Sequence, residues 1–369
     1  MKTIRIKFQW GKKNGAVIPY FPVIAACILF AGLLAACTSS GLAKQNSGKK
    51  VSPNTALVTN IYTADPSAHV FDGKIYIYPS HDTDTVYPSD NDGGSYQMND
   101  YHVLSLDSFE SSCKDLGVVL SLKDIPWAQK QLWAPDAAYM NGKYYLYFPA
   151  KDKDGIFRIG AAVSDSPAGP FVPEESYIPG SFSIDPAVFV EDGEAYMFFG
   201  GIWGGQLERW ETGTYDASAK GPSGSEPALG PMVAKMSPDM LGFETTPEQI
   251  VILDQDGNPI QADDEPRRFF EAVWVHKYDG HYYLSYSTGT THYLVYAMSD
   301  NLLGPYTYKG TILDPVSGWT THHSIVEFEG KWYLFYHDAS LSNGVDSQRC
   351  VKYAELKYNE DGTIQQVEP

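Results

Sequence analysis

The feature that most constrains the fold of this chain is a short turn followed by alternating aromatic and aliphatic residues, which recurs five times. Asn-Gly and Asp-Gly turns tolerate a positive φ at both central positions, so each copy predicts a tight β-hairpin. The five copies read Asp72-Gly73-Lys-Ile-Tyr-Ile-Tyr78, Asn141-Gly142-Lys-Tyr-Tyr-Leu-Tyr147, Asp192-Gly193-Glu-Ala-Tyr-Met-Phe198, Asp279-Gly280-His-Tyr-Tyr-Leu-Ser285 and Glu329-Gly330-Lys-Trp-Tyr-Leu-Phe335.

The spacing of the copies indicates how they assemble. The turn glycines are separated by 69, 51, 87 and 50 residues, which is enough for a four-stranded antiparallel sheet and its loops in each unit. An apolar stretch precedes every turn, and a third strand-like segment follows several of them, as at residues 161–165 and 296–300. Repeated sheets of this kind predict an all-β, five-bladed β-propeller as a single domain over residues 57–369. A β-sandwich would not require five similar hairpins, and no sustained helical period is present.

The N-terminal segment predicts export and lipid anchoring. Residues 1–36 carry five basic side chains and no acidic one, and an apolar run over residues 23–36 follows, as in a secretory signal peptide. The run ends in Leu34-Ala35-Ala36-Cys37, which resembles a bacterial lipobox with Cys37 as the lipidated residue. Residues 37–56 read as a flexible tether. We therefore expect a lipoprotein of the cell envelope, held at the outer membrane and facing the periplasm or the cell surface.

The charge of the remaining chain excludes one class of partner. Without the five basic residues of the signal, 22 basic residues face 45 acidic ones, a net charge near −23. Such a surface repels phosphate backbones, so nucleic acid is not an expected partner. Only Cys113 and Cys350 remain beyond Cys37, which predicts neither a disulfide framework nor a cysteine metal site.

Acidic residues occupy equivalent places in several repeats. The inner strand of a blade starts near the propeller axis, so residues just before each hairpin should converge on one pocket. Carboxylates brought together in this way raise at least one pKa, which supplies an ionised base beside a protonated acid. Glycoside hydrolysis needs that combination. Eight residues before the repeat glycines at 73, 193 and 330 stand Asp65, Asp185 and His322, and nine before Gly280 stands Glu271.

With these residues in place, the chain over residues 60–355 resembles glycoside hydrolase family 43. The resemblance implies an inverting mechanism in which Asp65 is the general base, Glu271 the general acid and Asp185 a third acid that orients the acid and tunes its pKa. Ala272 follows Glu271 where a glycine is common in the family. The matching motifs are Ala64-Asp65-Pro66-Ser67, Leu132-Trp133-Ala134-Pro135-Asp136, Ser183-Ile184-Asp185-Pro186-Ala187, Phe270-Glu271-Ala272 and Thr321-His322-His323-Ser324.

The resemblance implies further site residues. Arg349 is expected to bind substrate near the base, and His322 to contact a central water cluster or a structural calcium ion at the axis; the chemistry itself needs no cofactor. Trp133 and Trp203 are expected to be stacking platforms for sugar. Residues 80–84 hold metal-like residue types, but without a second cluster at ligand spacing we interpret them as a loop at the pocket rim.

The expected substrates are plant polysaccharides or oligosaccharides: arabinan, arabinoxylan and xylo-oligosaccharides. Among the activities of the family we favour α-L-arabinofuranosidase over β-xylosidase. An endo-acting xylanase or arabinanase, and a carbohydrate-binding propeller without catalysis, stay open as alternatives. The loops at residues 80–100 and 201–232 are expected to decide between them. We expect a monomer.

Overall fold

The computed structural model describes residues 50–90 and 92–369. The predicted signal peptide, Cys37 and the first part of the predicted tether lie outside these residues. Helix in the described part consists of 3₁₀ turns, and none of its helices has the length and apolar character that crossing a bilayer requires. These turns are η1 (Leu122–Asp124), η2 (Trp203–Gly205), η3 (Leu207–Trp210) and η4 (Ser340–Ser342).

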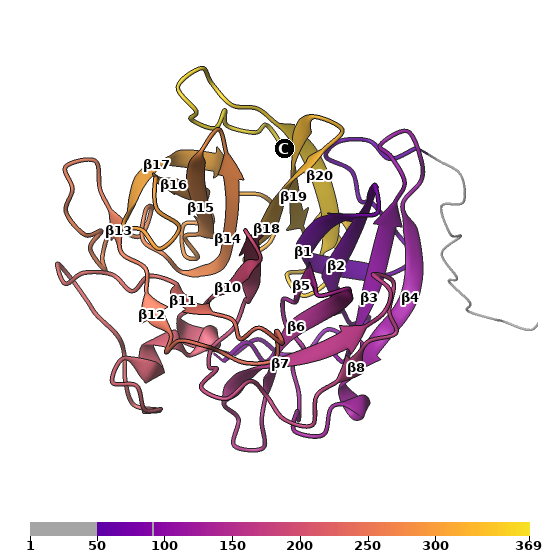
Figure 1. The fold of residues 1–369 in the computed structure, drawn as a ribbon, viewed down its shortest axis with the longest axis horizontal. Coiled ribbons are helices and arrows are strands. Elements are labelled where there is room, and N and C mark those ends of the chain that lie inside the picture. Colours follow the sequence, from indigo (N-terminus) through magenta and orange to yellow (C-terminus); the bar gives the residue numbers. More distant parts are fainter. Residues whose placement is uncertain (1–49, 91) are drawn as a thin grey trace, which may run out of the picture. The chain divides into compact units, whose positions relative to one another are not determined.

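Five sheets follow one another around a common centre, in chain order (Figure 1). Blade 1 contains β1 (Tyr62–Phe71), β2 (Lys74–Asp82), β3 (Asp100–Leu106) and β4 (Lys114–Ser121). Blade 2 contains β5 (Asp136–Met140), β6 (Lys143–Lys151), β7 (Phe157–Ser164) and β8 (Val172–Pro173). Blade 3 contains β9 (Ala187–Glu191), β10 (Glu194–Phe199), β11 (Met232–Lys235) and β12 (Glu248–Gln249). Blade 4 contains β13 (Ile252–Leu253), β14 (Glu271–Tyr278), β15 (His281–Ser287), β16 (Leu294–Ser299) and β17 (Tyr306–Leu313). Blade 5 contains β18 (His323–Phe328), β19 (Lys331–Asp338) and β20 (Cys350–Leu356).

The five predicted hairpins are confirmed, because each joins the first two strands of its antiparallel sheet. Both turn residues have a positive φ in every copy, 50° and 74° at Asp72 and Gly73 for example. Even Glu329, which is neither Asn nor Asp, adopts a φ of 53° ahead of Gly330. The predicted five-bladed propeller therefore rests on one local turn geometry used five times.

The sheets depart from the predicted four strands in two places. Blade 4 gains β13, which runs parallel to β17. Blade 5 has three strands, and the N-terminal segment pairs with its outer edge: the N–H of Asn54 donates to the carbonyl of Tyr353 at 2.8 Å, and that of Leu57 to Val351 at 2.9 Å. Val51 is also buried. The end of the predicted tether, residues 51–56, thus packs against the propeller, ahead of the predicted boundary at residue 57.

The hydrophobic core lies between neighbouring blades. One apolar cluster joins blades 1 and 2, a second joins blades 5 and 1, a third joins blades 2 and 3, and the largest spans blades 3, 4 and 5. Tyrosines fill much of this space and satisfy their hydroxyls on backbone carbonyls, as Tyr78 does on Pro167 at 2.7 Å and Tyr147 on Met240 at 3.0 Å. Cys113 and Cys350 are buried free thiols, and Cys113 belongs to the cluster between blades 5 and 1.

Candidate active site

A cavity of about 440 Å³ opens where the inner strands begin. Its walls come from segments at the starts of the first strands of all five blades and from loops at residues 86–98, 202–205 and 345–349, which are far apart in the sequence. The structure brings all seven predicted catalytic and substrate-binding residues into this one cavity, from seven separate stretches of chain. These residues are Asp65, Trp133, Asp185, Trp203, Glu271, His322 and Arg349.

Irregular backbone aims the acids into the cavity. Asp65 and Asp185 have φ values of 49° and 55°, and Ala272, next to Glu271, has a φ of 63°. The register of β1 with β2 shifts between Ala64 and Ser67, and that of β14 with β15 shifts after Glu271. A left-handed conformation at a non-glycine residue costs about 1–3 kcal/mol and is typical of functional sites. The bulges turn the carboxylates out of the strict alternation of their strands.

Asp65 is buried and held in its ionised form. Its Oδ1 accepts a hydrogen bond from Arg349 Nη1 at 2.9 Å, and its Oδ2 accepts one from the Ser80 hydroxyl at 2.6 Å. Burial alone would raise the pKa of Asp65, but the Arg349 charge, the histidines around it and the Ser80 hydroxyl together lower it to about 2. The backbone N–H of Asp65 donates to His337 Nδ1 at 2.9 Å. This carboxylate can therefore accept a proton but does not supply one at neutral pH.

Arg349 is fixed by a residue that sequence analysis did not identify as functional. Asp82 Oδ2 accepts from both the backbone N–H and Nε of Arg349 at 2.9 Å, and Oδ1 accepts from Nη2 at 2.8 Å. Arg349 is buried, not a surface charge. The sequence predicted a loop at the pocket rim for residues 80–84, but this is wrong for residues 80–82, which form the end of strand β2. Ser80 and Asp82 point toward Asp65 and Arg349, and the signal that could have found them is their i, i+2 spacing after the first hairpin.

Asp185 and Glu271 form a second acidic centre. Asp185 is buried, and its Oδ2 accepts a hydrogen bond from the N–H of Ala272 at 2.8 Å, so it fixes the backbone that carries Glu271. Burial and the nearby charges of Glu271 and Asp65 raise the pKa of Asp185. Burial and the charge of Asp65 raise the pKa of Glu271, against a smaller lowering by Arg349. The cavity thus holds an ionised acid on one blade and a proton-carrying pair on two others.

The structure also tests whether His322 suits a calcium ion. Its Nδ1 accepts the backbone N–H of His323 at 2.9 Å, so the neutral ring carries its proton on Nε2. Nε2 is buried without a hydrogen-bond partner and lies 3.8 Å from Asp185 Oδ2. A donor N–H suits a water or a sugar hydroxyl, and calcium prefers oxygen ligands. Direct calcium ligation by His322 therefore does not fit this geometry.

Aromatic side chains form much of the cavity wall. Trp133 is held by a hydrogen bond from Nε1 to the carbonyl of Tyr96 at 3.0 Å. Trp203 is 48% exposed and packs edge-on against Phe270, with ring centroids 5.2 Å apart. Sequence analysis missed Tyr96, Phe270 and Trp319, which also line the cavity. No repeat position distinguishes them from packing aromatics, although Phe270 precedes the predicted acid directly.

Gly201 offers a steric test of how tightly Glu271 is placed. A methyl group at Gly201 would lie 2.7 Å from the Ile184 side chain and 3.2 Å from Cβ of Glu271. We expect Gly201→Ala to displace Glu271 and lower kcat/KM for the substrate by about ten- to a hundredfold. Gly310→Ala is the control, because its nearest neighbour would be a Tyr296 ring atom at 3.8 Å. Unchanged kinetics in a stable Gly201→Ala variant would show that Glu271 is not held in this way.

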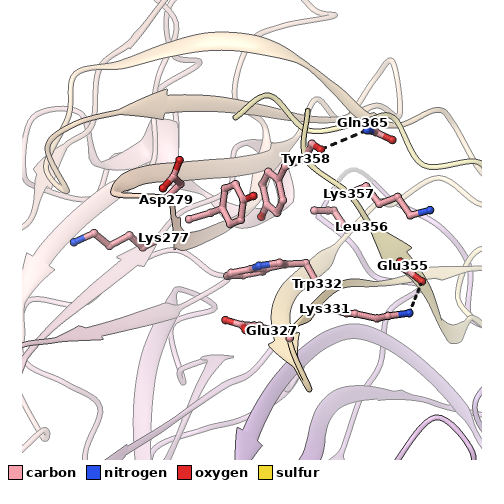
Figure 2. Close-up of a pocket in the computed structure, with 12 residues that line it drawn as sticks. Lys277, Asp279, Glu327, Lys331, Trp332, Glu355, Leu356, Lys357, Tyr358 and Gln365 are labelled. Carbon is pink, nitrogen blue, oxygen red and sulfur yellow. Dashed lines mark hydrogen bonds and ion pairs between the residues drawn. The ribbon is translucent and has the colours of Figure 1, made fainter. Parts of the chain in front are cut away.

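A second cavity, of about 590 Å³, lies between the hairpins of blades 4 and 5. Figure 2 shows its lining, with Trp332 between charged side chains. Its acids are exposed, and Glu355 accepts a hydrogen bond from Lys331 at 3.4 Å. The rings of Tyr278 and Tyr358 stack on each other with centroids 3.6 Å apart, so neither presents both faces. This cavity lacks the buried carboxylates of the first, which we take as the candidate active site.

Comparison with known proteins shows the family of the chain. Residues 54–364 match the sequence model of glycosyl hydrolases family 43. Xylosidase/arabinosidase 43A of Humicola insolens is 61% identical over 318 residues, which cover 84% of this chain and 97% of the relative. A β-xylosidase of Xylanibacter ruminicola is 54% identical over 309 residues, 83% of this chain and 97% of the relative.

A solved structure is similar over the same region. It is a family 43 β-xylosidase/α-arabinofuranosidase from a compost microbial metagenome, in complex with xylotriose and in a calcium-free form. The two chains superpose with a TM-score of 0.84 and 62% sequence identity, over 87% of this chain and 98% of the other.

Proposed function

This chain belongs to glycosyl hydrolase family 43, and we propose that it removes terminal β-D-xylose units from xylo-oligosaccharides, with α-L-arabinofuranosidase as a second activity of the same site. The observation that carries the proposal is the single cavity in which ionised Asp65 faces the Asp185 and Glu271 pair. The sequence alone favoured arabinofuranosidase. The names of the relatives, xylosidase/arabinosidase and β-xylosidase, support xylosidase as the main activity instead.

Asp65 acts as the general base in this proposal. A water molecule between Asp65 and the anomeric carbon gives its proton to the carboxylate while its oxygen forms the new bond to carbon. Each Asp65 oxygen already accepts one hydrogen bond, from Arg349 or from Ser80, and keeps a lone pair for the water. Arg349 and Asp82 position the base and need not touch the reacting atoms.

Glu271 acts as the general acid. As the glycosidic C–O bond breaks, the Glu271 carboxyl gives its proton to the leaving oxygen, so the departing sugar leaves as an alcohol. The raised pKa of Glu271 keeps that proton in place before the reaction. Asp185 supports this role through its hydrogen bond to the Ala272 N–H and through its charge coupling to Glu271. After release, exchange with solvent returns the proton from Asp65 to Glu271.

The stereochemistry of the product tests the mechanism. With separate base and acid the reaction proceeds in one displacement, and proton NMR of a β-xyloside digest should show α-xylose as the first product. A first product with the β configuration would require a covalent intermediate and would contradict base catalysis by Asp65.

The substrate is tested with matched nitrophenyl pentosides and with oligosaccharides. We expect higher kcat/KM on the β-D-xyloside than on the α-L-arabinofuranoside, and equal amounts of xylose and xylobiose from xylotriose in the first minutes. Internal cleavage of xylan or arabinan would favour an endo-acting enzyme, and retained xylotriose binding with no hydrolysis would favour a binding protein.

The pH profile follows from the two acids. Activity requires ionised Asp65, whose pKa is lowered to about 2, and protonated Glu271, whose pKa is raised to about 8. We therefore expect kcat/KM to stay level through the mildly acidic range and to fall about tenfold per pH unit above the upper pKa. Measurement of kcat/KM from pH 4 to 10 checks this. A profile that falls on the acid side near pH 5 and lacks an alkaline limb would contradict this assignment of the ionised and protonated groups.

We also propose that Cys37 carries a lipid that anchors the enzyme in the cell envelope. The support is the sequence before it, Leu34-Ala35-Ala36, after a basic and then an apolar segment. Labelled palmitate should enter the wild-type protein, and Cys37→Ala should abolish labelling. A wild-type protein that takes up no label, or a Cys37→Ala protein that is labelled equally, would contradict the anchor.

A further inference from the structure

Two histidines and an aspartate meet on the face of blade 1 that points away from Asp65. His81 lies between Ser80 and Asp82 in β2, and both of these neighbours face the active site, so alternation turns His81 to the other side. The pairing of Ser80 with Tyr101 sets His81 opposite Asp100 on β3. His102 follows two residues later on the same face. The sheet register thereby supplies the second cluster that the sequence around residues 80–84 lacked.

The spacing of the three side chains suits a small metal ion. His81 Nδ1 lies 2.6 Å from Asp100 Oδ1, and His102 Nε2 lies 3.8 Å from the same oxygen. Ligand atoms around a tetrahedral zinc ion lie about 3.3 Å apart, given metal–ligand bonds of about 2.0–2.1 Å. The two observed distances bracket that value, so small rotations of the side chains would form three ligands once the metal displaces the His81 Nδ1 proton, which now lies in the hydrogen bond to Asp100. The side chains are 24%, 26% and 10% exposed, which leaves room for a water as the fourth ligand.

The ring of His102 is already in the tautomer that metal binding needs. Its Nδ1 lies 2.8 Å from Asp115 Oδ1, an acceptor-only atom when ionised, so Nδ1 carries the proton and Nε2 keeps its lone pair toward Asp100. Asp115 is itself held by Asn60 Nδ2 at 2.8 Å and by the N–H of Gly117 at 2.9 Å. A carboxylate behind a histidine is the usual outer support of a zinc ligand. His322, with its proton on Nε2, lacks this arrangement.

We propose that His81, Asp100 and His102 form a binding site for Zn²⁺ or a similar divalent transition metal. Two imidazoles and one carboxylate favour such an ion over calcium or magnesium, which prefer oxygen. The ion would join the end of β2 to the start of β3. These are the two stems of the segment that brings Tyr87, Asp90 and Tyr96 to the active-site cavity. The site is therefore a structural clamp beside the catalytic centre, and no catalytic step passes through it.

Blade 4 offers a matched control. His281 Nδ1 lies 2.6 Å from Asp300 Oδ1, the same distance as between His81 and Asp100. In the described part of the chain, however, the His81, Asp100 and His102 group is the one set of three metal-ligating side chains close enough to share an ion. A lone His–Asp pair and a three-ligand site thus occur in one molecule and can be compared directly.

The test measures zinc binding to the full chain in a Cys27→Ala/Cys37→Ala background, which removes the two thiols that precede the described residues. After chelator treatment and desalting, isothermal titration with ZnCl₂ should show one ion per chain, and zinc should raise the thermal unfolding midpoint. His81→Ala and His102→Ala should each weaken binding at least about tenfold, Asp115→Asn by about ten- to a hundredfold, and His281→Ala should leave it unchanged. Equal midpoints without metal would show that the variants fold.

Three outcomes would overturn the site: no saturable binding, binding that survives both histidine substitutions, or an equal loss in His281→Ala. Should His102→Ala fail to fold, His81→Gln on the more exposed histidine decides the question by the same titration.

Discussion

Asp65→Asn is expected to lower kcat on a nitrophenyl β-D-xyloside by about 10²–10⁴-fold, the range that a positioned general base contributes. The amide has nearly the shape of the carboxylate but cannot take the proton of the attacking water. It also replaces an acceptor of the Arg349 and Ser80 hydrogen bonds, so part of the loss comes from a poorly oriented side chain. Initial rates under saturating substrate give the size of the effect.

Two controls separate lost chemistry from lost structure. Asp72→Asn changes an exposed aspartate in a turn of the same blade, where asparagine also tolerates the observed φ of 50°, and should leave kcat unchanged. Xylotriose should still bind Asp65→Asn with a Kd within a few-fold of the wild type. An Asp65→Asn enzyme that keeps more than a tenth of its kcat would remove Asp65 from the role of base.

The parts of the fold that the sequence predicted are those set by local geometry. A positive φ at Asp72 and Gly73, repeated at four other turns, fixes a hairpin whatever the rest of the chain does. Asp65 and Asp185 could be found because each stands eight residues before such a turn. The number of blades could therefore be predicted from the number of turns, and the positions of the three acids from their distance in the sequence to the turn glycines.

What could not be predicted depends on pairings between distant segments. Asp82 and Arg349 stand 267 residues apart in the sequence, and their bidentate contact exists only because blade 5 closes the ring onto blade 1. The packing of residues 54–57 against β20 has the same cause, which is why the predicted tether extended too far. The predicted preference for arabinofuranose over xylose had the least support in the sequence. Loop residues such as Tyr96 and Trp319 line the cavity, and they do not stand at a position that repeats from blade to blade.

Ring closure connects these observations to catalysis. The N–H of Thr63, in β1, donates to the carbonyl of Arg349 at 2.9 Å, next to the strand that the N-terminal segment covers. The charge that holds Asp65 ionised is thus positioned by the seam between the first and last blades. The acid pair Asp185 and Glu271 lies across blades 3 and 4, away from that seam. The propeller places Asp65, the proposed base, and Glu271, the proposed acid, on different blades of one cavity, where the Asp65 charge still helps to raise the pKa of Glu271.

Glu271→Ala is expected to show an effect that depends on the leaving group. With xylobiose, whose departing sugar needs a proton, kcat should fall by about 10²–10⁴-fold. With 2,4-dinitrophenyl β-D-xyloside, whose leaving group departs without a proton, the loss should be less than about tenfold, and the alkaline limb of the pH profile should disappear. That limb reports the loss of the proton from Glu271. Burial and the charge of Asp65 raise the pKa of this carboxyl.

Glu248→Ala is the matched control, because it removes an exposed glutamate from β12 of blade 3. It should leave both substrates and the pH profile unchanged. If Glu271→Ala slows both substrates equally, Glu271 contributes to binding or to the fold and not to protonation, and Asp185 becomes the candidate acid. If instead only xylobiose is slowed, the proton must come from Glu271, since Asp185 is buried with its Oδ2 bound to the Ala272 N–H and remains in the variant.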